Sequence, residues 1–104
     1  MNDASDIPDM PKNAAAAITQ KVTISNMRGL HARAASKFVT VAGGFDADIT
    51  VHREGTTVSG RSIMGLMMLA AGIGSEIELS AEGAEATEAI ASLVSLVEAK
   101  FEED

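Results

Sequence analysis

The chain has 104 residues, of which 46% are hydrophobic and 3% aromatic, and it carries no cysteine and a formal net charge of −7 at pH 7. This length suits one domain, and the composition predicts a core of aliphatic, alanine and methionine side chains. The lack of cysteine excludes a disulfide framework, thiolate catalysis and a cysteine zinc site, and the negative charge argues against nucleic acid as a partner.

The first 18 residues combine acids, Asn, Ser and both prolines with a run of alanines, and they show no apolar periodicity. We therefore expect a disordered tail over residues 1–18 and a single domain over residues 19–104. The tail is acidic and lacks the basic and apolar regions of a signal peptide. No apolar run reaches the roughly 18 residues of a membrane span. The expected location is the cytoplasm, without membrane insertion.

The first half of the domain alternates between strand and helix patterns. Residues 21–25 alternate polar and apolar side chains, as a strand with one buried face does. Residues 31–42 place apolar side chains at helical spacing, and two glycines follow. Residues 46–52 alternate again and lead through a turn into residues 56–59, which predicts a hairpin.

The second half predicts a short helix over residues 62–71, a strand over residues 76–79 and a long amphipathic helix from residue 84. The glutamates of the last helix are expected to form a solvated face. Its apolar stripe is predicted to consist of Ala86, Ile90, Leu93, Val94, Val97 and Phe101.

The order of elements is thus βαββαβα, and each strand has one apolar and one polar face. Such strands fit an antiparallel sheet that is covered on one side only. We predict an α+β fold, a two-layer open-faced sandwich in which three helices share one face of a four-stranded antiparallel sheet. The sequence contains no internal repeat and no glycine-rich nucleotide fingerprint.

Charge is distributed unevenly along the chain. Residues 82–104 carry a net charge of −6, whereas residues 19–81 carry +1. Within that middle segment, Arg28, Arg33 and Lys37 surround His31, and no acid is nearer in the sequence than Asp46. The sequence therefore predicts a locally positive site that an anion could approach.

His31 stands directly before a helical segment, so its imidazole is expected beside the unpaired backbone N–H groups of a helix N-terminus. The positive end of the helix dipole disfavours the imidazolium, which keeps a neutral, nucleophilic ring nitrogen available near pH 7. The same N–H groups, together with Arg33, can hold phosphoryl oxygens. Gly29 lacks a Cβ, which would let a partner or a donor phosphate approach closely. A helix cap or an ordinary surface residue is the alternative interpretation of this histidine.

The segment Gly29-Leu30-His31-Ala32-Arg33-Ala34-Ala35 resembles the active-site segment of HPr, the histidine phosphocarrier family of the phosphoenolpyruvate-dependent phosphotransferase system. The resemblance implies that His31 accepts a phosphoryl group as a pros-phosphohistidine and that Arg33 assists it. It also implies a phosphate-binding set of Gly29, Ala32, Arg33 and Ala34. The expected partners are enzyme I as donor and an enzyme IIA protein as acceptor, with no cofactor, no metal and a monomeric carrier.

A second segment, Gly60-Arg61-Ser62-Ile63-Met64-Gly65-Leu66, resembles the part of the family that carries a regulatory serine. Ser62 stands where a helix N-cap belongs. The resemblance implies that Ser62 is a candidate phosphosite for an HPr kinase/phosphorylase. If Leu66, Leu69 and Ala70 point inward, an exposed apolar patch remains for partner docking. This patch would comprise Ile63, Met64, Met67 and Met68, with ordinary core packing of the methionines as the alternative.

The resemblance covers about residues 20–101 and has one departure, because the family usually has proline where this chain has Ala34. Alanine restores a backbone N–H and frees the chain. This departure and the tail point to the nitrogen-related branch over the sugar-uptake branch.

Two other functions compete with phosphoryl transfer. One is a regulatory binding module whose phosphorylation state is read by a target without onward transfer. The other is a small metal- or ligand-binding domain. The sequence disfavours it, because the chain has only two histidines and they lie on different elements. His52, on the polar face of its strand, is expected to be a plain surface residue.

Overall fold

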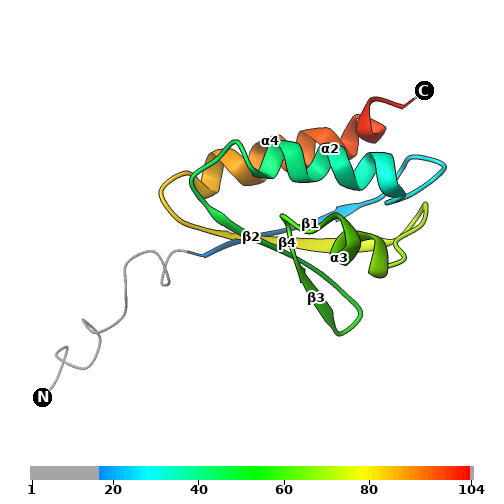
Figure 1. Cartoon of the computed structure of the whole chain (residues 1–104), viewed down its shortest axis with the longest axis horizontal. Helices are drawn as coiled ribbons and strands as arrows, with labels where there is room; N and C mark the ends of the chain where they lie inside the picture. Colours follow the sequence, from blue (N-terminus) through cyan, green and yellow to red (C-terminus); the bar gives the residue numbers. More distant parts are fainter. Residues whose placement is uncertain (1–16, 104) are drawn as a thin grey trace, which may run out of the picture.

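The computed structural model describes residues 17–103, which form the predicted βαββαβα order followed by a short 3-10 turn (Figure 1). Most of the predicted tail lies outside these residues, and Ile18 is already the first residue of a strand. No helix among the described residues is long and apolar enough to cross a membrane. The elements are β1 (Ile18–Thr23), α2 (Ala32–Ala42), β2 (Asp48–Arg53), β3 (Thr56–Ser59), α3 (Ile63–Met68), β4 (Glu76–Glu82), α4 (Ala86–Glu98) and η2 (Lys100–Glu102).

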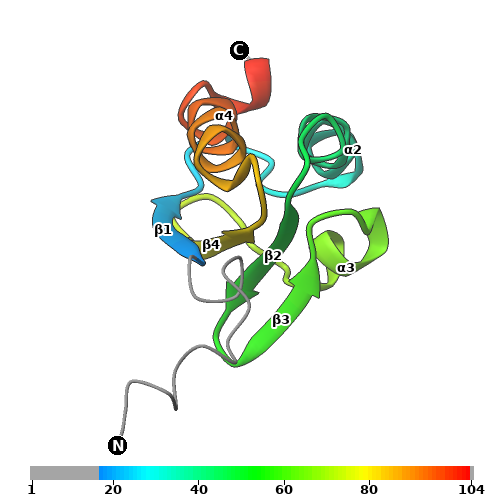
Figure 2. The same cartoon turned by 90° about the vertical axis from the view of Figure 1, so that its left-hand side faces the viewer.

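The four strands form one antiparallel sheet in the order β1-β4-β2-β3. Its register aligns apolar side chains across neighbouring strands, with Leu79 opposite Val51 and Ile77 opposite Val22. Because side chains alternate between the faces of a strand, these residues share one face. Figure 2 shows helices α2, α3 and α4 on one side of the sheet, and no element of the described residues covers the other side, which confirms the predicted open-faced sandwich.

The core is aliphatic and alanine-rich as predicted, but it contains no methionine among the described residues. The described methionines all lie at the surface, so the prediction of methionine packing was wrong. Two of the three phenylalanines, Phe38 and Phe101, fill the remaining volume and are fully buried. The small alanines of α2 and α4 permit close packing of these helices.

Helix α3 is shorter than the predicted span of residues 62–71. It ends at Met68, because Ala70 adopts a left-handed conformation with φ 52°. The backbone carbonyl of Ala71 instead accepts a hydrogen bond from the N–H of Leu30 at 2.9 Å. The end of α3 is therefore joined to the loop that precedes His31.

Helix α4 also ends before the predicted stripe is complete. Lys100, Phe101 and Glu102 have φ values of 58°, 56° and 62°, so the chain reverses in a left-handed turn after Glu98. We call residues 99–103 the C-terminal turn. Phe101 is buried by this turn and not by a continuing helix. On α4 itself Leu96 is buried and Val94 only partly buried, a small rotation from the predicted stripe.

Candidate functional site

The loop that precedes His31 is held by the loop that follows α3. The N–H of Ile24 donates to the carbonyl of Ser75 at 2.8 Å, and the N–H of Gly74 donates back to Ile24 at 2.8 Å. With the Leu30–Ala71 hydrogen bond, these contacts fix the entry to α2 from two sides. The position of His31 therefore depends on a segment some forty residues away in the sequence.

Gly29 fits this loop for a different reason from the one the sequence suggested. Its φ is +66°, and a Cβ there would lie 2.7 Å from the Cα of Gly72. The missing side chain thus makes room for the protein's own backbone and not for an approaching partner, which corrects the prediction. Its N–H already donates to the carbonyl of Asn26 at 3.1 Å, so it is not free to hold a phosphate.

His31 is the N-cap of α2, as predicted. Its backbone is extended, with φ −77° and ψ −179°, and its Nδ1 atom accepts a hydrogen bond from the N–H of Arg33 at 3.3 Å. The carbonyl of His31 accepts the first helical hydrogen bond, from Ala35 at 2.8 Å. The N–H groups of Ala32 and Ala34 have no hydrogen-bond partner among the described residues. The helix start therefore offers free donors beside the ring.

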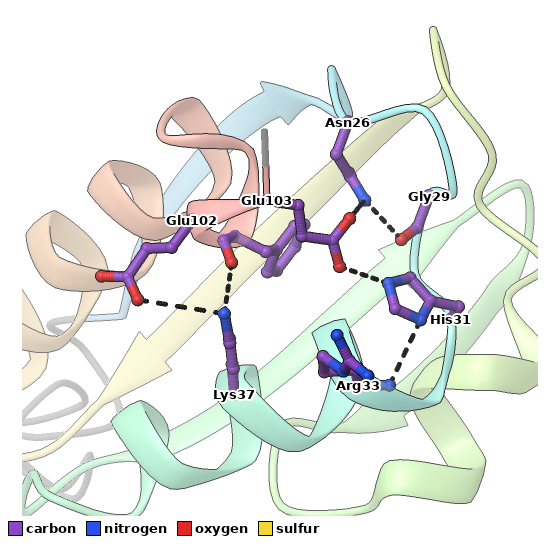
Figure 3. Close-up of polar contacts among 8 residues, drawn as sticks. Asn26, Gly29, His31, Arg33, Lys37, Glu102 and Glu103 are labelled. Carbon is purple, nitrogen blue, oxygen red and sulfur yellow. Dashed lines mark hydrogen bonds and ion pairs between the residues drawn. The ribbon is translucent and has the colours of Figure 1, made fainter.

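The other ring nitrogen, Nε2, contacts the carboxylate of Glu103 (Figure 3). The side chains are both largely enclosed, His31 being 22% and Glu103 14% exposed. The buried Asn26 supports this pair, since its Nδ2 atom donates to Glu103 Oε1 at 3.1 Å and to the carbonyl of Gly29 at 2.8 Å. The hydrogen bond to His31, followed by the one from Asn26, lowers the pKa of Glu103 against an opposing effect of desolvation.

Sequence reasoning missed Glu103 and expected a solvated glutamate. The C-terminal turn brings it to His31, and Lys37 holds that turn from α2. Lys37 Nζ donates to the carbonyl of Phe101 at 2.7 Å and lies 3.9 Å from Glu102 Oε1. No apolar periodicity signals a left-handed turn of non-glycine residues. The one available signal was Phe101, an aromatic residue among acids at the end of the chain.

The hydrogen bonds define the chemistry of the imidazole. Nδ1 accepts from a backbone N–H, and Nε2 faces a carboxylate that can only accept. The ring proton therefore belongs on Nε2, and the Nδ1 lone pair faces the N-terminus of α2. A neutral imidazole in this arrangement is a nucleophile at Nδ1, with backbone donors placed around any anion that it attacks.

Arg28, Arg33 and Lys37, the cations predicted around His31, differ in whether they already have a partner. Lys37 is engaged by the C-terminal turn, whereas Arg28 and Arg33 are exposed and make no ion pair among the described residues. All three line a groove of about 680 Å³ together with Met27, Glu102 and Glu103. Two unpaired guanidinium groups are thus available to an anionic group beside His31.

Ser62 and the apolar side chains that follow it lie on α3. Ser62 caps this helix as predicted, its Oγ accepting from the N–H of Gly65 at 2.9 Å. Leu66 and Leu69 point inward as predicted. Ala70, which was also expected to point inward, is exposed. The exposed set Ile63, Met64, Met67 and Met68 is called the α3 patch below.

The α3 patch reaches the histidine. Met67 lines a shallow depression of about 330 Å³ that His31 and Arg28 also line. Met64 and Met68 are 73% and 74% exposed, so core packing of these side chains is excluded. A side chain of the α3 patch therefore shares a surface depression with His31.

His52 has a structural role in the hairpin. Its Nδ1 atom lies 2.8 Å from Thr57 Oγ1, and its Nε2 atom accepts from the N–H of Gly55 at 3.4 Å. Both ring nitrogens are used at the β2–β3 turn. Within residues 17–103, no three His, Cys, Asp or Glu side chains gather in a manner that could hold a metal ion.

Comparison with known proteins gives consistent matches over the described domain. The family described as "PTS HPr component phosphorylation site" matches residues 18–99. The phosphocarrier protein HPr of Pseudomonas aeruginosa is 48% identical over 84 residues, which is 80% of this chain and 93% of that protein. The phosphocarrier protein NPr of Shewanella violacea is 43% identical over 86 residues, covering 83% and 94%.

A solved structure matches as well. The crystal structure of an HPr from Thermoanaerobacter tengcongensis superposes with a TM-score of 0.80 at 42% identity, covering 84% of this chain and 98% of that chain. Both the sequence and the arrangement of elements therefore agree with one family.

Proposed function

The chain belongs to the HPr family of phosphocarrier proteins of the phosphotransferase system, and on this premise we propose that His31 accepts a phosphoryl group from enzyme I and passes it to an enzyme IIA protein. The observation that supports this assignment is the orientation of the ring, with Nδ1 at the N-terminus of α2 and Nε2 against Glu103. His52, the other histidine, has both nitrogens occupied in the hairpin.

The transfer needs no proton movement in this geometry. The Nδ1 lone pair attacks the phosphorus of a phosphohistidine on enzyme I, the donor P–N bond breaks, and its electron pair remains on the donor nitrogen. The proton stays on Nε2 throughout. The reverse displacement, with a histidine of enzyme IIA as nucleophile, returns the electron pair to Nδ1 of His31 and empties the carrier.

The phosphoryl oxygens have three proposed donors. Within the part of the chain that the structure describes, the N–H groups of Ala32 and Ala34 have no partner at the start of α2, and the Arg33 guanidinium makes no ion pair. Anions bind at helix N-termini because the unpaired N–H groups and the dipole act together. Gly29 contributes by shaping the loop, since its own N–H is already used.

The α3 patch is the proposed docking surface for enzyme I and enzyme IIA. Its methionines are flexible and polarizable, so one surface can pack against more than one partner. Ser62 begins the same helix, and phosphorylation there by an HPr kinase/phosphorylase is proposed to regulate docking. We expect the carrier to act as a monomer in the cytoplasm.

A regulatory module is the second candidate function. The presence of Ala34 in place of the usual proline favours the nitrogen-related branch. In that branch the phosphorylation state could itself be the signal, with no onward transfer. The two functions share His31 as acceptor and differ in whether the phosphoryl group leaves for enzyme IIA.

The test is incubation of the chain with enzyme I and labelled phosphoenolpyruvate, followed by addition of an enzyme IIA protein. We expect acid-labile label on the wild type and on His52→Ala, none on His31→Ala, and movement of the label to enzyme IIA. Full labelling of His31→Ala would refute the acceptor assignment. Label that remains on the chain with every enzyme IIA supplied would favour the regulatory module.

A further inference from the structure

We propose that Glu103 is a positioning residue for phosphoryl transfer, which keeps the ring proton on Nε2 of His31 in both the empty and the phosphorylated carrier. This inference rests on the proposed function and adds a residue that the linear motif around His31 does not contain. Glu103 lies 72 positions away and reaches the ring only through the C-terminal turn.

The contact is built by several independent interactions. Phe101 is fully buried and anchors the C-terminal turn in the core. Lys37 fixes the carbonyl of Phe101 from α2, and Asn26 donates to Glu103 Oε1 from the loop. The carboxylate thus has one oxygen on Asn26 and the other on His31, as Figure 3 shows. A side chain held at both oxygens is oriented and not merely nearby.

The carboxylate acts differently in the two states of the carrier. In the empty carrier it accepts the Nε2–H hydrogen bond and thereby selects the tautomer whose lone pair is on Nδ1. In the phosphorylated carrier the ring bears a positive charge while Nε2 remains protonated. The carboxylate stabilises that charge, as a buried acid stabilises an imidazolium in a catalytic triad.

The protonated ring is the form from which the phosphoryl group departs readily. When the Nδ1–P bond breaks, its electron pair returns to Nδ1, and the leaving group is neutral imidazole with its proton still on Nε2. An unprotonated ring would have to leave as an imidazolate anion. Glu103 therefore favours onward transfer without touching the phosphoryl group.

The other charged groups near the ring either disfavour its positive charge or do not contact it. Arg28 on the loop and Arg33 on α2 are cations and disfavour a positive ring. Lys37 and Glu102 interact mainly with the C-terminal turn and with each other. Among the described residues, Glu103 is the acid in direct contact with the imidazole.

The experiment compares wild type with Glu103→Gln, Glu103→Ala and Glu103→Asp, each as the full chain, with Glu98→Gln as a matched charge control on the exposed end of α4. The first measurement is the tautomer of His31 in the unphosphorylated protein, from the 15N chemical shifts of the two ring nitrogens. The second is the pH profile for hydrolysis of the phosphorylated protein, prepared with phosphoramidate so that no enzyme I is needed.

We expect the share of the Nδ1–H tautomer to increase about tenfold in Glu103→Ala, the lower end of what a hydrogen bond to a charged group contributes. Hydrolysis of phosphorylated Glu103→Gln and Glu103→Ala should slow by about tenfold at alkaline pH, because the ring loses its proton more readily. Glu103→Asp should show smaller changes than Glu103→Ala in both the tautomer share and the hydrolysis rate. Glu98→Gln should match wild type in both.

The inference fails if Glu103→Ala matches wild type in either measurement. Melting temperatures within a few degrees of wild type, as for most surface substitutions, would show that the variants are folded. Neither readout uses enzyme I, so the outcome is separate from the test of the proposed function. Wild type that accepts no label from enzyme I would refute that function, whereas normal labelling with unchanged tautomer and hydrolysis would refute only the role of Glu103.

Discussion

The Nδ1 atom of His31 accepts a hydrogen bond from the backbone N–H of Arg33, so the residue that orients the imidazole also carries a guanidinium group that makes no ion pair within residues 17–103. The backbone of Arg33 fixes the ring in the resting state. Its side chain is free to meet an anion. These two functions belong to different atoms of one residue, so they can be separated by substitution.

Arg33→Ala should therefore leave the fold and the orientation of the ring intact and slow phosphoryl transfer. Charge moves between two nitrogens through the transferring group, and a preorganised cation matters most at that point. We expect a loss of about 10²-fold in the transfer rate constant, with a smaller change in the affinity for enzyme I. Arg33→Lys should retain only part of the wild-type rate constant, since lysine lacks the planar guanidinium group that can bind an anion with two hydrogen bonds. Rapid-quench kinetics that give equal rate constants for wild type and Arg33→Ala would remove the side chain from the mechanism.

Gly29→Ala should destabilise the protein. The residue has φ +66°, and the added Cβ would press on the backbone of Ala71 and Gly72. We expect a loss of about 1–3 kcal/mol in the free energy of unfolding, measured by urea denaturation. Gly72→Ala is the matched control, because no atom beyond its own chain neighbours lies within 4 Å of the position its Cβ would take. Equal stability of the two variants would show that the loop can relax around Gly29.

The sequence predicted the strands, the helices and the capping histidine because each leaves a local pattern. Period-two alternation marks strands, helical spacing marks α2 and α4, and Ser62 precedes its helix as a cap does. These signals depend on residues within about one turn of one another. Local patterns are therefore sufficient to predict the order of elements.

The features around the site that sequence reasoning missed depend on contacts between distant segments. Ala70 and Phe101 adopt left-handed conformations that favour glycine, and tertiary contacts of Ala71 and Lys37 hold the chain there. The role of Gly29 depends on a backbone forty residues away. Glu103 looked like one solvated acid among several, because nothing local distinguishes an acid that will meet a histidine.

Met64→Glu should weaken docking of enzyme I without unfolding the protein. Met64 is 73% exposed, so a charge there remains solvated in the free carrier. In the complex the same charge would have to be desolvated against an apolar contact, which is costly. We expect at least a tenfold rise in Kd, about 1.4 kcal/mol, by isothermal titration calorimetry.

Ile73→Glu is the control for Met64→Glu. Ile73 is 60% exposed and lies outside the α3 patch, so its substitution adds the same charge to a different surface. We expect Kd to be nearly unchanged. A comparable loss of affinity in both variants would mean that net charge, and not the α3 patch, controls docking.

Glu103 should contribute to the free energy of unfolding at a pH above the range in which its carboxyl group titrates, and not at a pH below that range. The pKa of Glu103 is lowered from 4.5 in the folded protein, chiefly by the hydrogen bond to His31, so the ionised form favours folding. The contribution is complete above about pH 4.5 and is lost as the pH falls through the lowered pKa. The difference in unfolding free energy between wild type and Glu103→Gln should therefore shrink between pH 6 and pH 3. A difference that stays constant over this range would contradict the stabilising hydrogen bond between Glu103 and His31.

Ser62→Asp should lower the rate of His31 phosphorylation by enzyme I while leaving the fold intact. The serine begins α3, where a negative charge is stabilised by the helix dipole and by unpaired N–H groups, so a carboxylate or a phosphate is tolerated there. The same charge adjoins Ile63 and Met64 of the α3 patch, where it would repel an acidic partner and add a desolvation cost to docking.

The comparison requires three variants with melting temperatures and initial rates of phosphorylation measured side by side. Ser62→Ala removes the hydroxyl that accepts from Gly65 at 2.9 Å, so it should lose about 1 kcal/mol of stability and keep a nearly normal rate. Thr87→Asp adds the same charge to the first turn of α4, another helix N-terminus away from the α3 patch, and should not slow the reaction. A rate at least tenfold lower in Ser62→Asp alone, equivalent to about 1.4 kcal/mol, would locate the effect at the patch. If Ser62→Asp accepts the phosphoryl group as fast as Thr87→Asp, Ser62 is only a helix cap, because a charge at the centre of a docking surface must be desolvated whenever that surface is used.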